Sequence, residues 1–354
     1  MKKFRPYIKC LIFIAGMAVI IGLSDFLFAK TGYINYILRQ ADSGKEDYQE
    51  FVLGASHARC AIDPVKLEEK SDINTLNMAI PGETIKDSYY LLQELNNHNN
   101  VHKIILDIDY NYWYGNLGEG CFAEPFLYAQ YSWKSPVKWK YMVQNMDSMD
   151  FRNSFTKKFV YEYTFADIKA NVEQKTSDGY KKADIYSLDN SDAGGDYTGE
   201  GFFALPLPEG NPVGEDYVKS QMGIEKQDIN PYPEKYFRKL VEYCQNNNIE
   251  LVCVTSPITP TSMKRLGVDE AYRKLTALFD ELNVKYYDFN RARFDVLPRN
   301  DKDYIDKEGH MGGQLAYRYS EVLSKVLYED SNGIIDESQY FYDSYEKTYQ
   351  SIEE

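Results

Sequence analysis

The sequence has little of several residue types that mark common functional classes. It holds five cysteines and four histidines among 354 residues, and no two cysteines form a C-x-x-C pair. Such few and scattered cysteines exclude a disulfide framework and a thiolate zinc centre. A glycine-rich phosphate loop is also absent, which disfavours a nucleotide or flavin ligand. We therefore expect no cofactor and no bound metal.

The sequence also has fewer basic than acidic residues. The chain has 40 Lys and Arg residues against 54 Asp and Glu residues, which gives a net charge of -14. Binding to a nucleic acid requires Lys and Arg to neutralise phosphates, so we expect no nucleic-acid partner. The hydrophobic share of 44% is ample for a globular core, and the length is enough for roughly two domains of ordinary size.

The N-terminal residues depart from this acidic average. Four basic residues within 1–9 precede an apolar run at 10–29, in which Ser24 and Asp25 are the only strongly polar side chains. Twenty residues at ~1.5 Å each span the ~30 Å hydrocarbon core of a bilayer. A cleaved signal peptide is the alternative, but Leu27 makes a poor cleavage site before a cut at residue 29. The run therefore predicts an uncleaved transmembrane anchor.

The charges beside this run predict its orientation. Basic residues at 1–9 form a stub that the positive-inside rule places in the cytoplasm. Residues 30–46 are then a linker, and everything from about residue 31 is expected outside the cell membrane, on a single-pass anchor.

The remainder alternates short β-rich runs with longer amphipathic runs, a pattern typical of a parallel α/β sheet. The expected strands are 51–54, 75–80, 103–109, 249–255 and 284–289, and the expected helices are 85–95, 236–246, 271–282 and 314–328. The pattern predicts a three-layer α/β/α sandwich with a parallel five-stranded sheet over residues 47–330. Residues 112–231 interrupt it as an insertion or cap, and 331–354 form an acidic, tyrosine-rich tail expected to be peripheral.

Three short segments at strand or helix ends could carry chemistry. Ser56 follows the first strand in Leu-Gly-Ala-Ser-His, Gly82 closes the segment Asn-Met-Ala-Ile-Pro-Gly, and His310 closes Asp-Lys-Glu-Gly-His before the last helix. A glycine lets the backbone approach a ligand and offer an N–H. An aspartate four residues before a histidine can orient the imidazole as a general base. Each segment alone is equally compatible with an ordinary turn.

The order of these segments resembles that of the SGNH (GDSL-like) hydrolases, which are flavodoxin-like α/β/α sandwiches. More narrowly, Phe-Val-Leu-Gly-Ala-Ser-His, Ile-Pro-Gly-Glu-Thr-Ile-Lys-Asp-Ser-Tyr-Tyr and Gly-His-Met-Gly-Gly-Gln-Leu-Ala are similar to membrane-anchored bacterial members. These include the DltD-like proteins associated with D-alanylation of teichoic acids. The resemblance covers about residues 47–110 and 233–328.

The resemblance implies a role for each of these residues. Ser56 would be the nucleophile, His310 the general base and Asp306 its orienting acid. The backbone amides of Ser56 and Gly82 would form part of an oxyanion hole, and Asn111 would substitute for the asparagine that the family carries in a Gly-x-Asn-Asp setting.

The acid–histidine segment departs from the family pattern. Three residues separate Asp306 from His310, where the family has two. A longer loop can absorb the extra residue; otherwise Asp303 or Glu308 serves instead, or the Ser–His dyad works without an acid.

Other side chains near the expected site have competing interpretations. His57, Asn77 and Trp113 are candidate substrate contacts, although His57 is equally a turn histidine bonded to backbone. Trp113, Trp133 and Trp139 form either a saccharide platform or the insertion's own core. Asp107, Asp109 and Asn111 match the start of an EF-hand loop, but the later positions fail. Cys60 is expected to be a small buried side chain.

The sequence thus predicts an extracytoplasmic serine esterase or acyltransferase. By the resemblance, it would move acetyl or D-alanyl groups onto or off an envelope polysaccharide or teichoic acid, with a membrane protein as acyl donor. The alternative is a non-catalytic scaffold or binding protein in polymer assembly or export, for which the longer acid–histidine loop is the main support.

Overall fold

The computed structural model describes residues 5–44, 46–71, 73–114, 123–146, 152–161, 163–188, 195–209, 228–266 and 268–352. The chain divides into two compact units. The first, which we call the helical unit, comprises residues 1–40 and 124–189. The second, the sheet unit, comprises residues 41–123 and 190–354. The predicted insertion is therefore shared between the two units.

The sheet unit is built on five parallel strands in the order β2-β1-β3-β6-β7. They are β1 (Tyr48–Leu53), β2 (Asn74–Asn77), β3 (Lys103–Asp107), β6 (Glu250–Thr255) and β7 (Lys285–Asp288). β3 lies at the centre of this sheet, and all five of its residues are buried, as expected for a parallel strand covered on both faces. The predicted parallel five-stranded sheet is confirmed. From β1 the chain adds β2 on one side, and the later strands β3, β6 and β7 follow on the other side. Sheets of this kind bind their ligands at that switch point, between β1 and β3.

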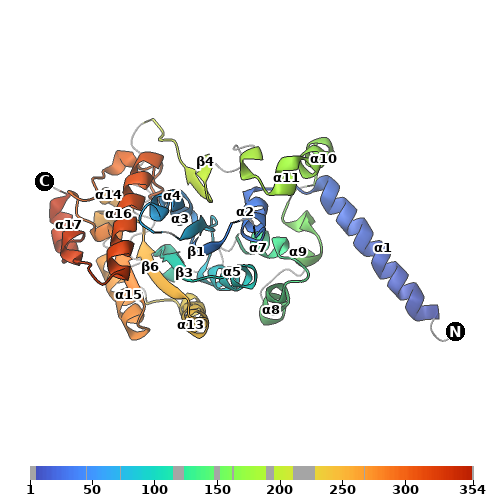
Figure 1. The fold of residues 1–354 in the computed structure, drawn as a ribbon, viewed down its shortest axis with the longest axis horizontal. Coiled ribbons are helices and arrows are strands. Elements are labelled where there is room, and N and C mark those ends of the chain that lie inside the picture. The colour runs from blue at the N-terminus through green and yellow to red at the C-terminus, as the bar shows by residue number, and fades with distance from the viewer. Residues whose placement is uncertain are drawn as a thin grey trace. The chain divides into compact units, whose positions relative to one another are not determined.

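Helices cover both faces of the sheet, as Figure 1 shows. They are α3 (Ser56–Ala61), α4 (Pro64–Glu68), α5 (Ile85–His98), α13 (Pro231–Asn246), α14 (Pro260–Leu266), α15 (Asp269–Glu281) and α16 (Gly313–Ser331). α5 packs on α13, and α16 packs on α3 and α4. The buried residues Leu315, Tyr319 and Leu323 repeat every four positions along α16, so they form a stripe that faces the core.

Local sequence sets where these helices begin. Thr84 and Asp87 form a reciprocal capping box at the start of α5. Asp63 accepts a hydrogen bond from the backbone of Val65, and Pro64 occupies the first position of α4, where a missing N–H costs nothing. α5 therefore starts directly after the Pro-Gly turn that borders the expected site, and α4 starts directly after the short helix that Ser56 begins.

The sheet unit also contains short elements. They are α6 (Asn111–Tyr114), β4 (Asp196–Gly199), β5 (Phe202–Ala204), η7 (Phe289–Arg291), η8 (Asp301–Asp303), η9 (Glu337–Gln339) and α17 (Tyr345–Ser351). β4 and β5 form a two-stranded antiparallel ribbon, and β5 contacts α3 and α16. The fully buried Phe202 joins the main core, so the end of the predicted insertion packs with the sheet unit.

The C-terminal segment is not peripheral, which corrects the expectation above. Phe341 is buried in the main core and its ring stacks on that of Tyr287, with centroids 6.0 Å apart. Tyr345 is also buried and its hydroxyl donates to the carboxylate of Asp288. Tyrosine can bury its ring while its hydroxyl finds a polar partner, so an acidic, tyrosine-rich segment without a simple period still packs.

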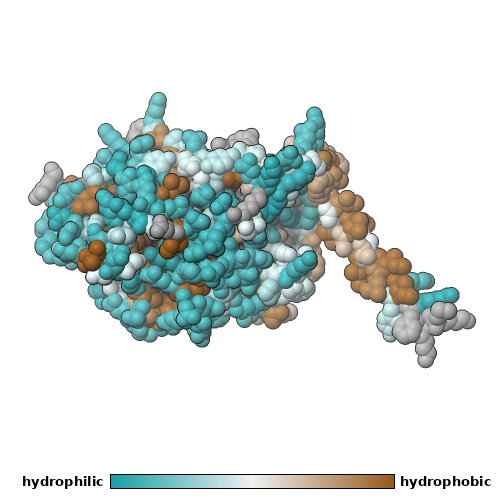
Figure 2. Space-filling model, in the orientation of Figure 1, coloured by the Kyte–Doolittle hydropathy of each residue, from teal (hydrophilic) through white to brown (hydrophobic). Residues whose placement is uncertain are grey.

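The helical unit contains only helices among its described residues. They are α1 (Arg5–Phe28), α2 (Tyr33–Ala41), α7 (Ala123–Gln130), α8 (Pro136–Gln144), α9 (Arg152–Phe155), η3 (Lys157–Phe159), α10 (Ile168–Thr176), α11 (Asp178–Lys182) and η4 (Ile185–Ser187). α1 is long and apolar enough to span a membrane or to be a signal sequence, and Figure 2 shows hydrophobic residues along most of it.

Candidate active site

The turn after β1 holds Ser56 at the edge of the sheet. Gly54 has a φ of 142°, and a Cβ built there would lie 3.0 Å from Cβ of Asp107 and 3.1 Å from Cβ of Ala58. Only glycine fits this conformation and this close approach. Ser56 follows as the first residue of α3 and is half-buried.

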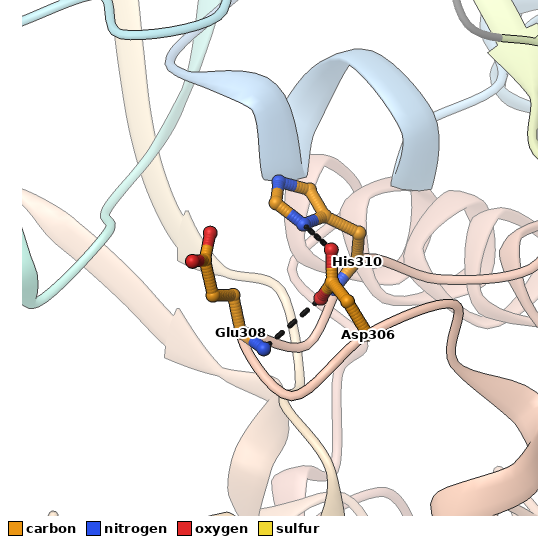
Figure 3. Close-up of side chains that lie close together, drawn as sticks. All are labelled: Asp306, Glu308 and His310. Carbon is orange, nitrogen blue, oxygen red and sulfur yellow. Dashed lines mark hydrogen bonds and ion pairs between the residues drawn. The ribbon is translucent and has the colours of Figure 1, made fainter. Parts of the chain in front are cut away.

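The loop before α16 wraps around the carboxylate of Asp306. Oδ1 of Asp306 accepts the backbone N–H groups of Glu308, Gly309 and His310 at 3.0, 3.0 and 3.2 Å. Oδ2 lies 2.6 Å from Nδ1 of His310 (Figure 3). Gly309 takes a φ of 100°, which a side chain would disfavour. The additional residue between Asp306 and His310 is thus absorbed by this turn.

The imidazole of His310 connects Asp306 to Ser56. Its Nε2 atom lies 2.7 Å from Oγ of Ser56, across 254 residues of sequence. With the Nδ1 proton directed at the carboxylate, Nε2 accepts the hydroxyl proton. Burial alone would raise the pKa of Asp306, but the hydrogen bond and charge of His310 hold the pKa below its usual range. Asp306 is therefore ionised at neutral pH.

The two alternative acids have other positions. Asp303 caps η8 through the backbone N–H of Asn300 and lies 3.5 Å from the Arg318 guanidinium. The Glu308 carboxylate is exposed, and in Figure 3 Asp306 rather than Glu308 meets Nδ1. Asp306, Glu308 and His310 each have a ligand atom within 4.8 Å of the others and could hold a metal ion. A cation bound at either imidazole nitrogen would displace one of the two hydrogen bonds just described.

The segment after β2 runs beside the Ser56 turn. The N–H of Ile80 donates to the carbonyl of Gly54 at 3.0 Å, which fixes the two loops together. Gly82 follows two residues later with a φ of 75°, a left-handed conformation that favours glycine. Asn111 begins α6, but its side chain lies outside the described residues. The oxyanion roles of Ser56, Gly82 and Asn111 stay predictions.

A buried carboxylate that the sequence did not single out supports this turn. Glu83 is 3% exposed and accepts hydrogen bonds from the backbone N–H of Ile80 and the hydroxyl of Ser88. Burial raises its pKa well above the usual range. Glu83 therefore positions the Pro-Gly turn from inside the core, and its place next to Gly82 was the only signal that could have found it.

Two predicted substrate contacts are wrong. Asn77 is fully buried, and its amide donates to the carbonyls of Ala58 and Ile62 at 2.9 and 2.8 Å. Its Oδ1 atom accepts the N–H of Ala79, so the amide group ties β2 to the end of α3 and its oxygen braces the segment after β2. Trp113 is also fully buried, because its ring packs against Phe237 and Phe279.

His57 forms a second acid–histidine pair next to the first. Its Nδ1 atom lies 3.3 Å from Oδ2 of Asp109, and its ring centroid is 4.5 Å from that of His310. His57 is 8% exposed, and its Nε2 atom has no hydrogen-bond partner in the part of the chain that the structure describes. The ring is therefore paired with a carboxylate rather than with backbone.

The electrostatic setting of His57 is strongly negative. Burial would lower its pKa, but the carboxylates of Asp109, Asp107 and Asp306 outweigh burial and raise the pKa to about 9. Burial also raises the pKa of Asp107 to about 6, although the charge of His57 opposes it. Asp107 accepts the backbone N–H of Ser256 at 2.8 Å. Asp107 and Asp109 thus surround an imidazolium instead of forming the start of a calcium loop.

Cys60 does not compete as a nucleophile. Its side chain is fully buried in α3, where burial raises the pKa of the thiol to about 12. At neutral pH it is a neutral thiol, and only the thiolate is nucleophilic.

Comparison with known proteins gives structural likeness only. No model of a known family matches the chain, and no curated protein matches its sequence. The psychrotrophic esterase EstA from Pseudoalteromonas sp. has a TM-score of 0.35 and 13% identity, over 81% of this chain and all of that one. A GDSL-like lipase from Bacteroides thetaiotaomicron has a TM-score of 0.36 and 9% identity, over 85% of this chain and all of that one. The likenesses are thus to an esterase and to a GDSL-like lipase, and the narrower DltD-like resemblance stays a prediction.

Proposed function

We propose that the protein is a hydrolase or acyl-transfer enzyme that uses Ser56 as its nucleophile. One observation carries the proposal: a single imidazole bridges a carboxylate, at 2.6 Å, and a serine hydroxyl, at 2.7 Å. A serine hydroxyl is a weak nucleophile unless a base within hydrogen-bond reach removes its proton. The chain from Asp306 through His310 to Ser56 supplies that base and the group that orients it.

The reaction runs in two steps of the same kind. Oγ of Ser56 attacks the acyl carbonyl while its proton passes to Nε2 of His310. That proton then leaves with the alcohol of the substrate, and the acyl group stays on Ser56. In the second step His310 takes the proton of water or of an acceptor hydroxyl, whose oxygen attacks the ester. The acyl group departs with that oxygen, and the proton returns to Ser56.

Each step passes through a tetrahedral intermediate whose negative oxygen needs stabilisation. We assign this to the backbone amides of Ser56 and Gly82, which belong to the two loops joined by the Ile80–Gly54 hydrogen bond. The imidazolium of His57 adds a positive potential, because its ring is 4.5 Å from that of His310. Fixed charges of this kind act without the reorganisation that water would require.

The proposed substrate is an acyl ester of an envelope polymer outside the cell membrane. An acetyl or D-alanyl group on a polysaccharide or teichoic acid fits this class, with water or a polymer hydroxyl as acceptor. The support is α1, whose length and apolar surface suit a membrane anchor that keeps the enzyme beside such polymers. A membrane protein would then present the acyl donor.

Labelling with a fluorophosphonate tests the nucleophile. The full-length chain in detergent should be labelled at Ser56, and Ser56→Ala should abolish the label. Ser338→Ala, at an exposed serine in η9, is the matched control and should be labelled like the unchanged protein. A folded protein that takes no label, or a label unaffected by Ser56→Ala, would end the enzymatic proposal and favour a scaffold or binding role.

A further inference from the structure

The helical unit carries an exposed group of three aromatic side chains. Trp133, Trp139 and Phe155 are 43%, 51% and 55% exposed. The ring centroid of Trp133 lies 5.6 Å from that of Trp139 and 5.4 Å from that of Phe155. We call these three residues the aromatic patch. They are not the core of the predicted insertion, since they pack on one another at the surface.

The patch continues along one face of α8. Val143 and Met146 are 68% and 60% exposed and follow Trp139 at helical spacing, so the three share a face of α8 and the turn after it. The opposite face is buried through Val137 and Tyr141. α8 is thus apolar on both faces, and the outer face lacks a protein partner among the described residues. A contiguous exposed apolar face of this kind marks an interaction surface.

Contacts within the same unit place the patch beside the end of α1. The carboxylate of Asp25 accepts the hydroxyl of Thr156 at 2.9 Å and the N–H of Lys157 at 3.1 Å, directly after Phe155. Phe28, the last residue of α1, has its ring 5.4 Å from that of Phe165, which is 85% exposed. In Figure 1, α8 and α9 lie on the side of this unit toward which α1 extends to the N-terminus.

The charge around the patch opposes that of the whole chain. Residues 132–160 contain six Lys or Arg residues and two Asp residues, within a chain of net charge -14. Lys134 and Lys158 are exposed, and the ammonium of Lys138 lies 4.5 Å from the ring centroid of Trp133. Tryptophan and lysine together are typical of the headgroup region of a bilayer, and basic residues there bind anionic lipids.

We propose that α8, α9 and the aromatic patch rest in the headgroup layer of the bilayer that α1 spans, in contact with anionic phospholipid. Phe155 of the patch directly precedes Thr156 and Lys157, which hydrogen-bond to Asp25 near the end of α1. Amphipathic helices of this kind lie in the plane of the interface with their apolar side chains among the acyl chains. The proposal is independent of the acyl-transfer chemistry and rests on α1 remaining attached.

Tryptophan fluorescence tests this contact, because the chain has three tryptophans and one is buried in the sheet unit. Trp113→Phe leaves the two tryptophans of the patch as fluorophores, and the double variant Trp133→Phe with Trp139→Phe leaves Trp113. Both full-length proteins are placed in vesicles of phosphatidylcholine and phosphatidylglycerol whose acyl chains carry bromine near the carbonyl. Bromine should quench most of the emission of the patch and little of that of Trp113.

Three results would overturn the proposal. The first is that bromine quenches both variants equally, or does not quench the patch tryptophans at all. The second is that the protein is recovered without residues 1–29. The third is a response of patch emission to soluble teichoic acid in place of the lipid, which would identify a saccharide platform. Replacing phosphatidylglycerol with phosphatidylcholine should weaken quenching of the patch, and Lys134→Glu with Lys158→Glu should do the same. Lys325→Glu, at an exposed position of α16, is the charge-matched control. It should change neither the quenching of the patch nor its dependence on phosphatidylglycerol.

Discussion

Two acid–histidine pairs lie at one edge of the sheet, and they differ in what the second imidazole nitrogen does. In the loop before α16, His310 has Asp306 on one nitrogen and the hydroxyl of Ser56 on the other. In the turn after β1, His57 has Asp109 on one nitrogen, and its other nitrogen, Nε2, is buried without a hydrogen-bond partner among the residues that the structure describes. The same residue types thus give a candidate proton carrier in one place and a fixed charge in the other.

The surroundings explain this difference. Asp306 is bound by three backbone N–H groups, which stabilise its negative charge, and the other nitrogen of its imidazole partner lies beside the hydroxyl of Ser56. His57 instead faces Asp109, Asp107 and Asp306 from a buried position, and these carboxylates hold its proton. An acid beside a histidine therefore indicates a general base only where a hydroxyl lies on the other side.

The largest expected effect is the loss of activity when Ser56 or His310, of the first pair, is replaced. Ser56→Ala and His310→Ala should each lower kcat/KM for ester hydrolysis by roughly 10⁴-fold or more, because each removes one half of a single proton-transfer unit. The double variant should be no worse than either one. Additive losses, measured with an aryl ester on the full-length protein, would show that the two residues do not act as a unit.

Replacement of the orienting acid, Asp306, should give the next largest loss of activity. Asp306→Asn keeps an oxygen for the loop N–H groups but turns an NH₂ group toward His310, which favours the wrong tautomer. We expect a loss of roughly 10³- to 10⁴-fold in kcat. Asp303→Asn is the matched control, and its loss should be below tenfold. If the two variants lose equal activity, Asp306 is not the acid that orients the imidazole.

The second pair should contribute less to the rate. His57→Gln keeps a side chain of similar length and removes the positive charge, so we expect a loss of roughly tenfold in kcat, below the 10²- to 10³-fold seen for direct oxyanion donors. The unchanged protein should lose this advantage as pH rises through about 9, where His57 loses its proton. A ratio of rates that stays constant across that range would contradict the charge-based role.

The smallest effect concerns stability. The pKa of His57 is raised from 6.5 in its ordinary state to about 9 in the fold, so the stabilisation is complete below about 6.5 and is lost as pH rises through about 9. The midpoint of thermal unfolding should fall by a few degrees over this interval. Because other groups titrate too, the measurement is the difference from His57→Gln, which should fall less. Parallel curves for the two proteins would refute the coupling.

The sequence predicted the sheet and the place of three site residues for the same physical reason. Buried parallel strands are continuous apolar runs, and their carboxyl ends meet at one edge, so Ser56 and Gly82 had to lie near each other. The start of α16 could be read from its four-residue repeat of buried positions. The position of His310 at that start then followed from chain order alone.

The sequence could not distinguish buried polar side chains from exposed ones. Asn77 and Trp113 are residue types that often contact substrates. Whether the amide of Asn77 bonds to backbone, or the ring of Trp113 packs on phenylalanine, depends on neighbours elsewhere in the chain. Asp107 and Asp109 matched part of a calcium loop, although Asp109 pairs with a histidine some fifty residues earlier and Asp107 accepts the N–H of Ser256. The division of residues 112–231 between two units follows from tertiary packing, which no local period reveals.

The pairing of β3 with β6 has a consequence for how the protein is made. These central strands join 103–107 to 250–254, so roughly 140 intervening residues must be synthesised before the sheet can close. Until then β3 presents an unpaired edge of Ile104, Ile105 and Leu106, a template for aggregation. The contact between Ser56 and His310 forms later still, because His310 lies 254 residues after Ser56. We therefore expect a nascent chain to be inert toward acyl esters until nearly all of it has emerged, because Ser56 lacks its histidine partner until then.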